Sequence, residues 1–385
     1  MKRKIKMGMV GGGRGAFIGA VHRIAALMDG HIEMVCGALS SDPENAKLSG
    51  LDWYLPEERS YGSYEKMIKT EKSLPEGERM DMVVIVTPNY LHYEPAKMAI
   101  ENGFHVVCDK PLAFSTEEAE KLAILVEKSG LVFALTHTYT GYPMVKEARN
   151  MIKTGKLGKL RKVIVEYPQG WLSTALEQTG QKQADWRTDP KRSGKGGAVG
   201  DIGTHAGNLA EYITGLKITR LCADVTTFVG GRRLDDDVNV LIHMEQEVKG
   251  ILHCSQICAG EENDVNIRVY GEKGGIEWHQ HDPNTLLVKQ SGKPVEIYRA
   301  GTDKSYLGAR AMANQRTPGG HPEGYLEAFA NIYRNVAHLI QARIQGLEPD
   351  PHSFDFPTVH DGVRGMRFID AVINSGQKNA KWVEV

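Results

Sequence analysis

The chain has 385 residues, which is too long for one ordinary domain and long enough for two. Its 47 Lys and Arg residues balance 48 Asp and Glu residues, so a formal net charge of −1 provides no long-range field for a nucleic-acid backbone or an anionic membrane. Hydrophobic residues make up 41% of the chain and charged residues 25%, which excludes a disordered protein.

In the first third of the chain, short apolar runs alternate with helical stretches. The predicted strands are Ile5–Val10, Ile32–Ala38, Met82–Val86, His105–Cys108 and Leu131–Leu135. The predicted helices are Ile18–Met28, Ala96–Asn102 and Thr116–Ser129. Strand–helix alternation with nearly continuous apolar strands indicates a doubly wound parallel sheet, and we expect this α/β domain to cover residues 1–138.

Beyond that point longer strands dominate, and we expect a second domain over residues 139–385. Its predicted strands are Leu160–Glu166, Ile218–Val229, Val238–His243, Gly250–Ile257, Asn266–Gly271 and Gly275–Trp278. Its predicted helices are Met144–Thr154, His205–Thr214, Pro322–Gln345 and Val359–Ser375. This pattern predicts an α/β domain built on one large, open, mainly antiparallel sheet.

A glycine-rich turn, Gly11-Gly12-Gly13-Arg14-Gly15-Ala16, separates the first predicted strand from the first helix. It matches the GxGxxA pattern: Gly11 permits the tight turn, Gly13 lets backbone amides approach a pyrophosphate, and Ala16 lets the helix pack closely. The helix N-terminus, with Phe17 and Ile18, then offers N–H donors to the phosphates. The turn therefore predicts dinucleotide binding.

The end of the second strand leaves the choice between NAD and NADP open. An acidic residue that accepts from the adenosine ribose is expected there for NAD, but the position falls on Leu39 or Ser40. Ser40 and Ser41, with Arg14, suit a 2′-phosphate. Asp42 can instead turn onto the ribose or cap the helix that begins at Pro43.

Of three further motifs, two directly follow predicted strands and the third opens a predicted helix of the second domain. They are Thr87-Pro88-Asn89-Tyr90-Leu91-His92, Asp109-Lys110-Pro111 and Gly196-Gly197-Ala198-Val199-Gly200-Asp201-Ile202-Gly203-Thr204-His205. With the glycine turn and the closing segment 355–362, they resemble the glucose–fructose oxidoreductase/inositol dehydrogenase/rhizopine-catabolism (Gfo/Idh/MocA) family of NAD(P)-dependent oxidoreductases. One departure is Asp109, where that family usually has Glu before the Lys-Pro pair.

The resemblance implies a Rossmann domain, a substrate-binding sheet domain that also makes homo-oligomer contacts, and polyol, sugar or inositol substrates. It assigns catalysis to Lys110, Asp201 and His205. By the same resemblance, the cofactor contacts include Thr87, Pro88, Asn89, His92, Asp109 and Lys110.

The chemistry of hydride removal from a secondary alcohol requires such a set. A histidine, with an ordinary pKa of about 6.5, can take the hydroxyl proton and return it, and we expect His205 to do so. Lys110 would stabilise the negative charge that develops on the oxygen. Asp201 lies four residues before His205, so on a helix the two would share a face, and Asp201 can hold the lysine. The alternative is a purely structural role, in which Asp201 caps the helix and His205 is a half-buried side chain.

Candidate substrate contacts are less specific. Besides Lys110, Asp201 and His205, they are Tyr139, Tyr142, Trp171, Trp186, Arg187 and His321. Trp186 and Arg187 combine an indole for a sugar face with a cation for its hydroxyls, although such a pair is as often surface packing. His321 precedes a predicted helix and can equally be an ordinary loop residue.

The remaining signals are negative. The N-terminus lacks the apolar core of a signal peptide, no stretch reaches the length of a membrane span, and five cysteines without CxxC pairing favour reduced thiols, so we expect a cytoplasmic protein. Cys254 and Cys258, beside His253, have no second ligand cluster, so no metal is predicted. No charge pattern or motif indicates a nucleic-acid partner.

We therefore predict an NAD(P)-dependent sugar or polyol dehydrogenase that oxidises a ring hydroxyl reversibly. An isomerase or epimerase with a tightly bound cofactor is a second enzymatic alternative. A non-catalytic dinucleotide-binding regulator is the alternative from another class, and it would be expected to have lost part of the Lys110, Asp201 and His205 set.

Overall fold

The computed structural model describes residues 3–385, which form two compact units. The first unit comprises the described residues up to Thr138 together with Tyr325–Val363. The second comprises Tyr139–Gly324 and Arg364–Val385. Within the described range, we find no helix with both the length and the apolar character that a bilayer crossing requires.

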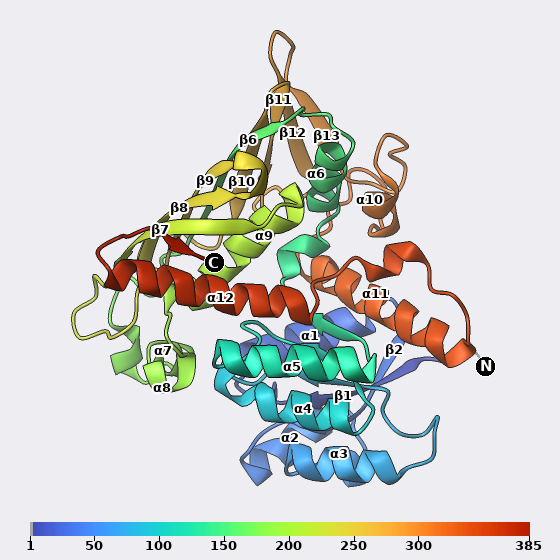
Figure 1. The fold of residues 1–385 in the computed structure, drawn as a ribbon. Coiled ribbons are helices and arrows are strands. Elements are labelled where there is room, and N and C mark those ends of the chain that lie inside the picture. Colours follow the sequence, from blue (N-terminus) through green and yellow to red (C-terminus); the bar gives the residue numbers. More distant parts are fainter. Residues whose placement is uncertain (1–2) are drawn as a thin grey trace. The chain divides into compact units, whose positions relative to one another are not determined.

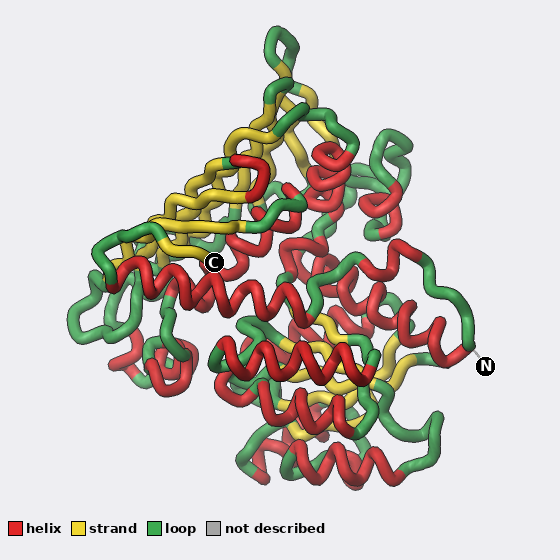
Figure 2. The backbone as a smooth tube through the Cα atoms, viewed as in Figure 1, coloured by secondary structure: helices red, strands yellow, loops and turns green. Residues whose placement is uncertain are grey.

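The first unit is built on a sheet of five parallel strands (Figures 1 and 2). They are β1 (Ile5–Val10), β2 (Ile32–Ala38), β3 (Met82–Ile85), β4 (His105–Cys108) and β5 (Phe133–Leu135). Most of their residues are buried, as in parallel sheets covered on both faces. The order β2-β1-β3-β4-β5 reverses direction between β1 and β3, the point at which such sheets bind ligands beyond the carboxyl ends of their strands. The predicted doubly wound sheet is confirmed.

Six helices belong wholly to this unit. They are α1 (Phe17–Leu27), α2 (Pro43–Asp52), α3 (Tyr64–Ser73), α4 (Tyr93–Glu101), α5 (Thr116–Ser129) and α11 (Tyr325–Gln345). Of these, the sequence indicated α2 only by its start at Pro43, and α3 was not predicted. Both begin at side-chain caps, since Asp42 accepts from the Asn45 amide and Ser63 from the Lys66 amide.

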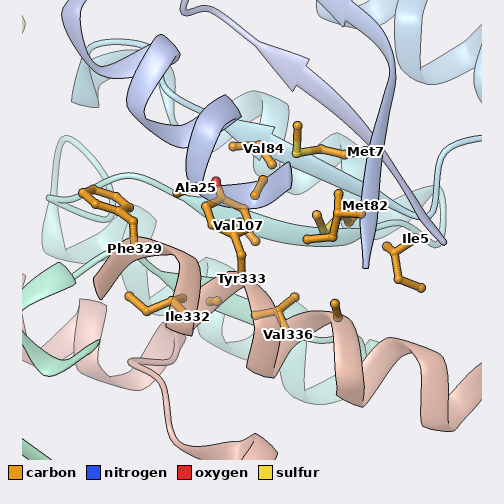
Figure 3. Close-up of a cluster of buried hydrophobic side chains, with 14 of the residues drawn as sticks. Ile5, Met7, Ala25, Met82, Val84, Val107, Phe329, Ile332, Tyr333 and Val336 are labelled. Atoms are coloured by element: carbon orange, nitrogen blue, oxygen red, sulfur yellow. The ribbon is translucent and has the colours of Figure 1, made fainter. Parts of the chain in front are cut away.

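Helix α11 is the reason why the first unit differs from the predicted domain 1–138. Its Phe329, Tyr333 and Val336 recur at helical spacing and join one buried cluster with Met7 of β1 and Met82 of β3 (Figure 3). The predicted second domain, 139–385, assigned this helix elsewhere. Its apolar residues pack on the parallel sheet and on α1, so the chain returns to the first unit after building most of the second.

The second unit is built on one sheet of nine strands (Figure 1). They are β6 (Leu160–Pro168), β7 (Ile218–Thr226), β8 (Asp237–Met244), β9 (Lys249–Ser255), β10 (Asn266–Gly271), β11 (Gly274–His279), β12 (Thr285–Gln290), β13 (Glu296–Arg299) and β14 (Val383–Glu384). Only the β6–β9 pair is parallel, so the predicted mainly antiparallel sheet is confirmed. The structure adds three strands to it, β12 to β14, of which β13 and β14 form the two edges.

Two helices of this unit pack on each other and on the sheet. They are α6 (Pro143–Lys153) and α9 (Thr204–Thr214), and a π-helical turn, η5 (Val199–Gly203), leads into α9. The other helices are α7 (Lys182–Arg187), α8 (Pro190–Ser193), α10 (Ala309–Ala313) and α12 (Val359–Gln377). From Arg364 onward α12 belongs to the second unit. Buried and exposed residues alternate along β8, so one sheet face carries the helices and the other is open.

Candidate active site

The glycine turn lies where the first sheet reverses direction. Gly11 follows β1 with φ of +82°, a conformation that favours glycine, and a Cβ added there would lie 2.9 Å from Thr87 Cγ2. Thr87 follows β3, so the two turns are in contact at the carboxyl ends of neighbouring strands. This is the place that a dinucleotide occupies in doubly wound folds.

The close contacts in the turn are not at the positions that the GxGxxA pattern predicts. A Cβ at Gly13 would lie 2.6 Å from Ser49 Oγ of α2 and 2.7 Å from the Leu39 carbonyl oxygen. The closest approach between α1 and the turn occurs at Gly19, where a Cβ would overlap the backbone of Gly12. Ala16, predicted to permit that approach, is instead the N-cap of α1.

The N-terminus of α1 fits an anion. Ala16 provides no side-chain cap, and the first turn of the helix contains no acidic residue, whereas α2 is capped by Asp42. The first N–H groups of α1 therefore combine with the positive end of the helix dipole, which is the arrangement that binds phosphate groups. Phe17 is exposed and Ile18 half-buried at this end. The residues of the turn thus fit a dinucleotide pyrophosphate.

The side chains predicted for the adenosine end have partners of their own. The Arg14 guanidinium forms a two-pronged ion pair with the Asp52 carboxylate, at 2.5 and 2.6 Å. Ser40 Oγ accepts from the Asp42 amide and from Asn45 Nδ2. Of the two roles open to Asp42, the structure shows the helix cap. Ser41 is exposed beside them.

His92, predicted to contact the cofactor, joins two backbone segments. Its Nδ1 lies 2.8 Å from the Pro111 carbonyl oxygen and its Nε2 lies 2.7 Å from that of Thr87. The ring is 1% exposed, and burial lowers its pKa, opposed by the charge of Asp109. Because a neutral imidazole carries one N–H, it can donate to one of these carbonyls at a time.

The turn after β4 presents Lys110 at the same sheet edge. One oxygen of Asp109 accepts from the Lys110 amide at 2.9 Å and from Thr136 Oγ1 at 2.7 Å, which fixes the turn to the end of β5. The Lys110 side chain is half-buried. The next residue after Thr136, His137, is buried, and burial together with the charge of Lys110 lowers its pKa to about 3. The sequence analysis did not single out His137.

The remaining predicted cofactor residues follow β3. Thr87 Oγ1 donates to the Leu91 carbonyl, Pro88 is half-buried, and Asn89 is 5% exposed at the start of a short 3-10 turn. In the first unit, the structure therefore brings the turns that carry Gly11, Thr87 and Lys110 to one edge of the sheet, because β1, β3 and β4 are parallel neighbours.

In the second unit, a buried carboxylate shapes the approach to the predicted catalytic pair. Asp235 accepts from the Gly197 amide at 2.6 Å and from the Val199 amide at 2.8 Å. Burial raises the pKa of Asp235 to about 6, against the opposing effect of these hydrogen bonds. A Cβ at Gly197 would strike the Asp235 backbone, so glycine is required there.

The structure corrects the predicted setting of Asp201. It lies in the π-helical turn η5 rather than on a regular helix, and α9 begins only at Thr204. The spacing argument that put Asp201 and His205 on one α-helical face therefore does not apply as stated. The bland reading of Asp201 as a helix cap is also wrong, since the N-cap of α9 is Gly203.

A continuous hydrogen-bond network leads away from Asp201. Its Oδ2 accepts from Gln256 Nε2 at 2.9 Å and from Arg187 Nε at 3.2 Å. Gln256 Nε2 also lies 3.5 Å from Gln169 Oε1, which accepts from Trp171 Nε1 at 3.0 Å. The carboxylate is thus held by a charged donor from α7 and by an amide donor that directly follows β9.

The network continues to two tyrosines, Tyr139 and Tyr167, whose rings contact the ring of His205. Gln169 and the Tyr167 hydroxyl both donate to Asn263 Oδ1, and the hydroxyls of Tyr139 and Tyr167 are hydrogen-bonded to each other. The His205 ring is 8% exposed and lies edge-on to the Tyr139 ring, with centroids 5.0 Å apart. Burial raises the pKa of Tyr139 to about 12, so its hydroxyl stays protonated.

Trp186 and Arg187 extend the same cluster on α7. The Arg187 guanidinium lies 4.3 Å from the centroid of the Trp186 ring and 5.9 Å from that of Trp171, which are cation–π distances. All three side chains are half-buried, so indole faces and a cation adjoin the Asp201 carboxylate. An ordinary surface pair would lack that connection.

His321 is the predicted substrate residue that the structure does not bring to this network. It is exposed, and its carbonyl accepts from Thr317 Oγ1. The network instead contains four residues that the sequence analysis did not propose as site residues: Tyr167, Gln169, Gln256 and Asn263. Gln169 and Gln256 directly follow β6 and β9, and that position was the available signal.

In comparisons with known proteins, a separate family model matches residues in each of the two units. The model of an oxidoreductase family with an NAD-binding Rossmann fold matches residues 5–137, and that of a GFO/IDH/MocA C-terminal domain matches residues 145–277. An oxidoreductase structure from Sinorhizobium meliloti is 44% identical, with 99% of both chains covered and a TM-score of 0.89.

Two further relatives have more specific names. An inositol dehydrogenase homologue from Azotobacter vinelandii, solved with NADH and myo-inositol, is 32% identical, with 100% of this chain and 98% of the other covered and a TM-score of 0.90. Levoglucosan dehydrogenase from Pseudarthrobacter phenanthrenivorans is 25% identical over 411 residues, with 100% and 98% covered. The similarity therefore extends through both units.

Proposed function

Because this chain belongs to the Gfo/Idh/MocA family of oxidoreductases with an NAD-binding Rossmann fold, we propose that it oxidises a ring secondary hydroxyl of a sugar, glycoside or inositol. The reaction transfers hydride to the nicotinamide cofactor, forms a ketone and is reversible. The relatives named for inositol and levoglucosan support this class of substrate.

The observation that carries the proposal is the network around Asp201 and His205. A polyol has many hydroxyls, each both donor and acceptor, and its recognition needs closely spaced groups of both kinds. The carboxylate of Asp201, the amides of Gln169 and Gln256 and the indoles of Trp171 and Trp186 supply such a surface. A non-catalytic regulator would have no need for this set beside a histidine.

We assign the proton transfer to His205. A ring nitrogen takes the proton of the hydroxyl as the C–H bond breaks, and returns it in the reverse direction. The tyrosine ring beside it fixes the plane of the imidazole, and Asp201, already held by Gln256 and Arg187, binds and orients the polyol. Preorganisation of this kind lowers the barrier because the groups need not reorient during the reaction.

In the nucleotide-binding unit, we assign charge stabilisation to Lys110. Its ammonium offsets the negative charge that develops on the substrate oxygen, and Asp109 holds the turn that carries it. NAD, when bound, supplies the hydride acceptor. Gly11, Gly13 and the uncapped start of α1 would hold its pyrophosphate, and the turn at Thr87, Pro88 and Asn89 would adjoin its nicotinamide half.

A substrate panel tests the proposal. The wild-type protein is incubated with NAD and, in turn, myo-inositol, free hexoses and methyl glycosides, and the nicotinamide absorbance is followed. We expect reduction of NAD by at least one polyol, and its loss in His205→Asn. Conversion of a sugar without added NAD would favour the isomerase alternative, and no response to any polyol would contradict the proposal.

Two features support further parts of the proposal. On the open face of the large sheet, Leu241 and Ile251 are cross-strand partners that remain 49% and 38% exposed, which supports homo-oligomer contacts through this face. Light scattering on the purified protein would measure the oligomeric state. The five cysteines are free thiols, two of them half-buried, which supports a cytoplasmic location; fractionation of cells would test it.

A further inference from the structure

One side of helix α2 is dedicated to holding Arg14 of the glycine turn. Asn45, Ser49 and Asp52 are spaced four and three residues apart, so they lie on one side of the helix. Each binds a different part of Arg14: Asn45 Nδ2 donates to its carbonyl at 3.3 Å, Ser49 Oγ accepts from its amide at 2.9 Å, and Asp52 pairs with its guanidinium. Backbone and side chain of the arginine are thus fixed together.

These contacts with Arg14 lie near the end of β2, because Asn45 Nδ2 also donates to Ser40 Oγ, and Ser40 follows that strand. In doubly wound dinucleotide-binding folds, the residues after the second strand face the adenosine ribose. An arginine there accommodates the 2′-phosphate of NADP, and an acidic residue accepts from the free 2′-hydroxyl of NAD. Here the arginine is present, but the edge of its guanidinium formed by Nε and Nη2 is bound to the Asp52 carboxylate.

We propose that Asp52 is a specificity-determining residue that selects NAD over NADP by engaging Arg14. A 2′-phosphate would either displace Asp52 from this edge or bind the Nη1 side of a guanidinium whose charge Asp52 already balances. In both cases the phosphate would lie near a carboxylate of the same sign. NAD carries no 2′-phosphate, so it can bind while Arg14 and Asp52 stay paired. The acidic group that discriminates is therefore supplied from the last turn of α2 rather than from the end of β2, where the sequence pattern lacks one.

The ion pair serves ligand selection rather than folding. Both side chains are nearly half exposed, at 47% and 43%, and exposed pairs of this kind contribute little to stability. Asp52→Asn is consequently expected to fold as the wild type does, which makes the substitution a clean test of selectivity.

The test measures dissociation constants of NADH and NADPH by nucleotide fluorescence, with the full-length protein and without substrate. We expect the wild type to bind NADH at least about tenfold more tightly than NADPH, because an unpaired like charge beside the phosphate is costly. In Asp52→Asn, the affinity for NADPH should rise about tenfold while that for NADH stays within about twofold. Adding Arg14→Ala should remove the gain.

Glu57→Gln serves as the matched control. It removes one exposed, lysine-paired carboxylate from the same unit and should leave both dissociation constants unchanged. Equal binding of the two nucleotides by the wild type, or an unchanged NADPH affinity in Asp52→Asn, would overturn this inference and leave the proposed function intact. Failure to bind either nucleotide would overturn both.

Discussion

The ring of His205 stands nearly perpendicular to the ring of Tyr139, with centroids 5.0 Å apart and an interplanar angle of 80°. The tyrosine hydroxyl is meanwhile hydrogen-bonded to Tyr167. One residue therefore has two separable functions: its ring sets the plane of the imidazole, and its hydroxyl belongs to the polar network.

Substitutions at Tyr139 should separate these functions. Tyr139→Phe keeps the ring against His205 and removes one network hydroxyl, so we expect a raised KM for the polyol and a kcat within about threefold of the wild type. Tyr139→Ala removes both and should lower kcat by about tenfold or more, because the imidazole is no longer oriented. Steady-state kinetics with the best substrate of the panel measure both constants. Equal kcat values in the two variants would contradict the orienting role.

Removing the proton acceptor should be more damaging. We expect His205→Asn to lower kcat by about 10²- to 10⁴-fold, the usual contribution of general acid–base catalysis, with NADH binding unchanged. Stopped-flow measurement of one turnover shows whether the loss lies in the chemical step. An unchanged single-turnover rate would exclude His205 from that step.

A prediction for His92 follows from its two carbonyl partners. Because it joins the turns of Thr87 and Pro111, next to Lys110, we expect His92→Leu to lower kcat about tenfold or more without raising the polyol KM. His92→Gln retains an amide donor and should restore part of kcat. His105→Gln is the matched control, since His105 also binds one backbone group, the Val132 amide, but at the start of β4, away from these turns. Equal losses of kcat at both positions would show a general effect of packing.

Asp235 predicts a pH dependence of stability. Its pKa is raised to about 6 in the folded protein, against about 3.9 for an exposed aspartate, so its favourable contribution is complete below about pH 4 and is lost as pH rises through 6. Relative to Asp235→Asn, the wild type should lose about 1 kcal/mol of unfolding free energy between pH 5 and pH 7. Urea denaturation of both proteins at the two pH values measures the difference. A free energy of unfolding of the wild type that rises relative to that of Asp235→Asn between pH 5 and pH 7 would have the wrong sign.

The glycine turn allows a test of packing. Gly19→Ala places a Cβ on the backbone of Gly12, and a side-chain movement cannot relieve this overlap. We therefore expect a loss of about 1–3 kcal/mol of stability and weaker NADH binding. Gly62→Ala in the same unit meets open space and should change neither. Thermal unfolding and nucleotide fluorescence provide the two readouts. Similar melting temperatures for the two variants would contradict the packing account.

Much of the fold was predictable because strands of the parallel sheet are almost fully apolar. The extent of helix α2 beyond its start at Pro43 was not predictable for a physical reason: its buried residues are Ala46, Ser49 and Gly50, which present no apolar stripe. Strand β13 lies at the edge of the sheet and has no fully buried residue, so it lacks the apolar pattern of an inner strand. The partners of α11 were also not predictable, since its periodicity shows that one side is buried but not against which sheet.

The candidate site was predictable only where residues cluster in sequence. The motifs around Gly11, Lys110 and Asp201 are contiguous, whereas Gln169 and Gln256 lie 87 residues apart and meet only because β6 and β9 are parallel neighbours with carboxyl ends at one edge. The Arg14–Asp52 pair has the same character, since it depends on how α2 packs against the glycine turn.

Transfer of an isotopic label shows whether the protein moves hydride from a ring carbon of the substrate to NAD. The wild-type protein is given NAD and a substrate from the panel with deuterium on the ring carbon that bears the reactive hydroxyl, and the reduced cofactor is analysed by mass spectrometry. If His205 and Lys110 support hydride transfer as proposed, we expect one deuterium in the NADH formed, together with the ring ketone. Absence of reduced cofactor, or NADH without deuterium while the ketone accumulates, would contradict hydride transfer from that carbon.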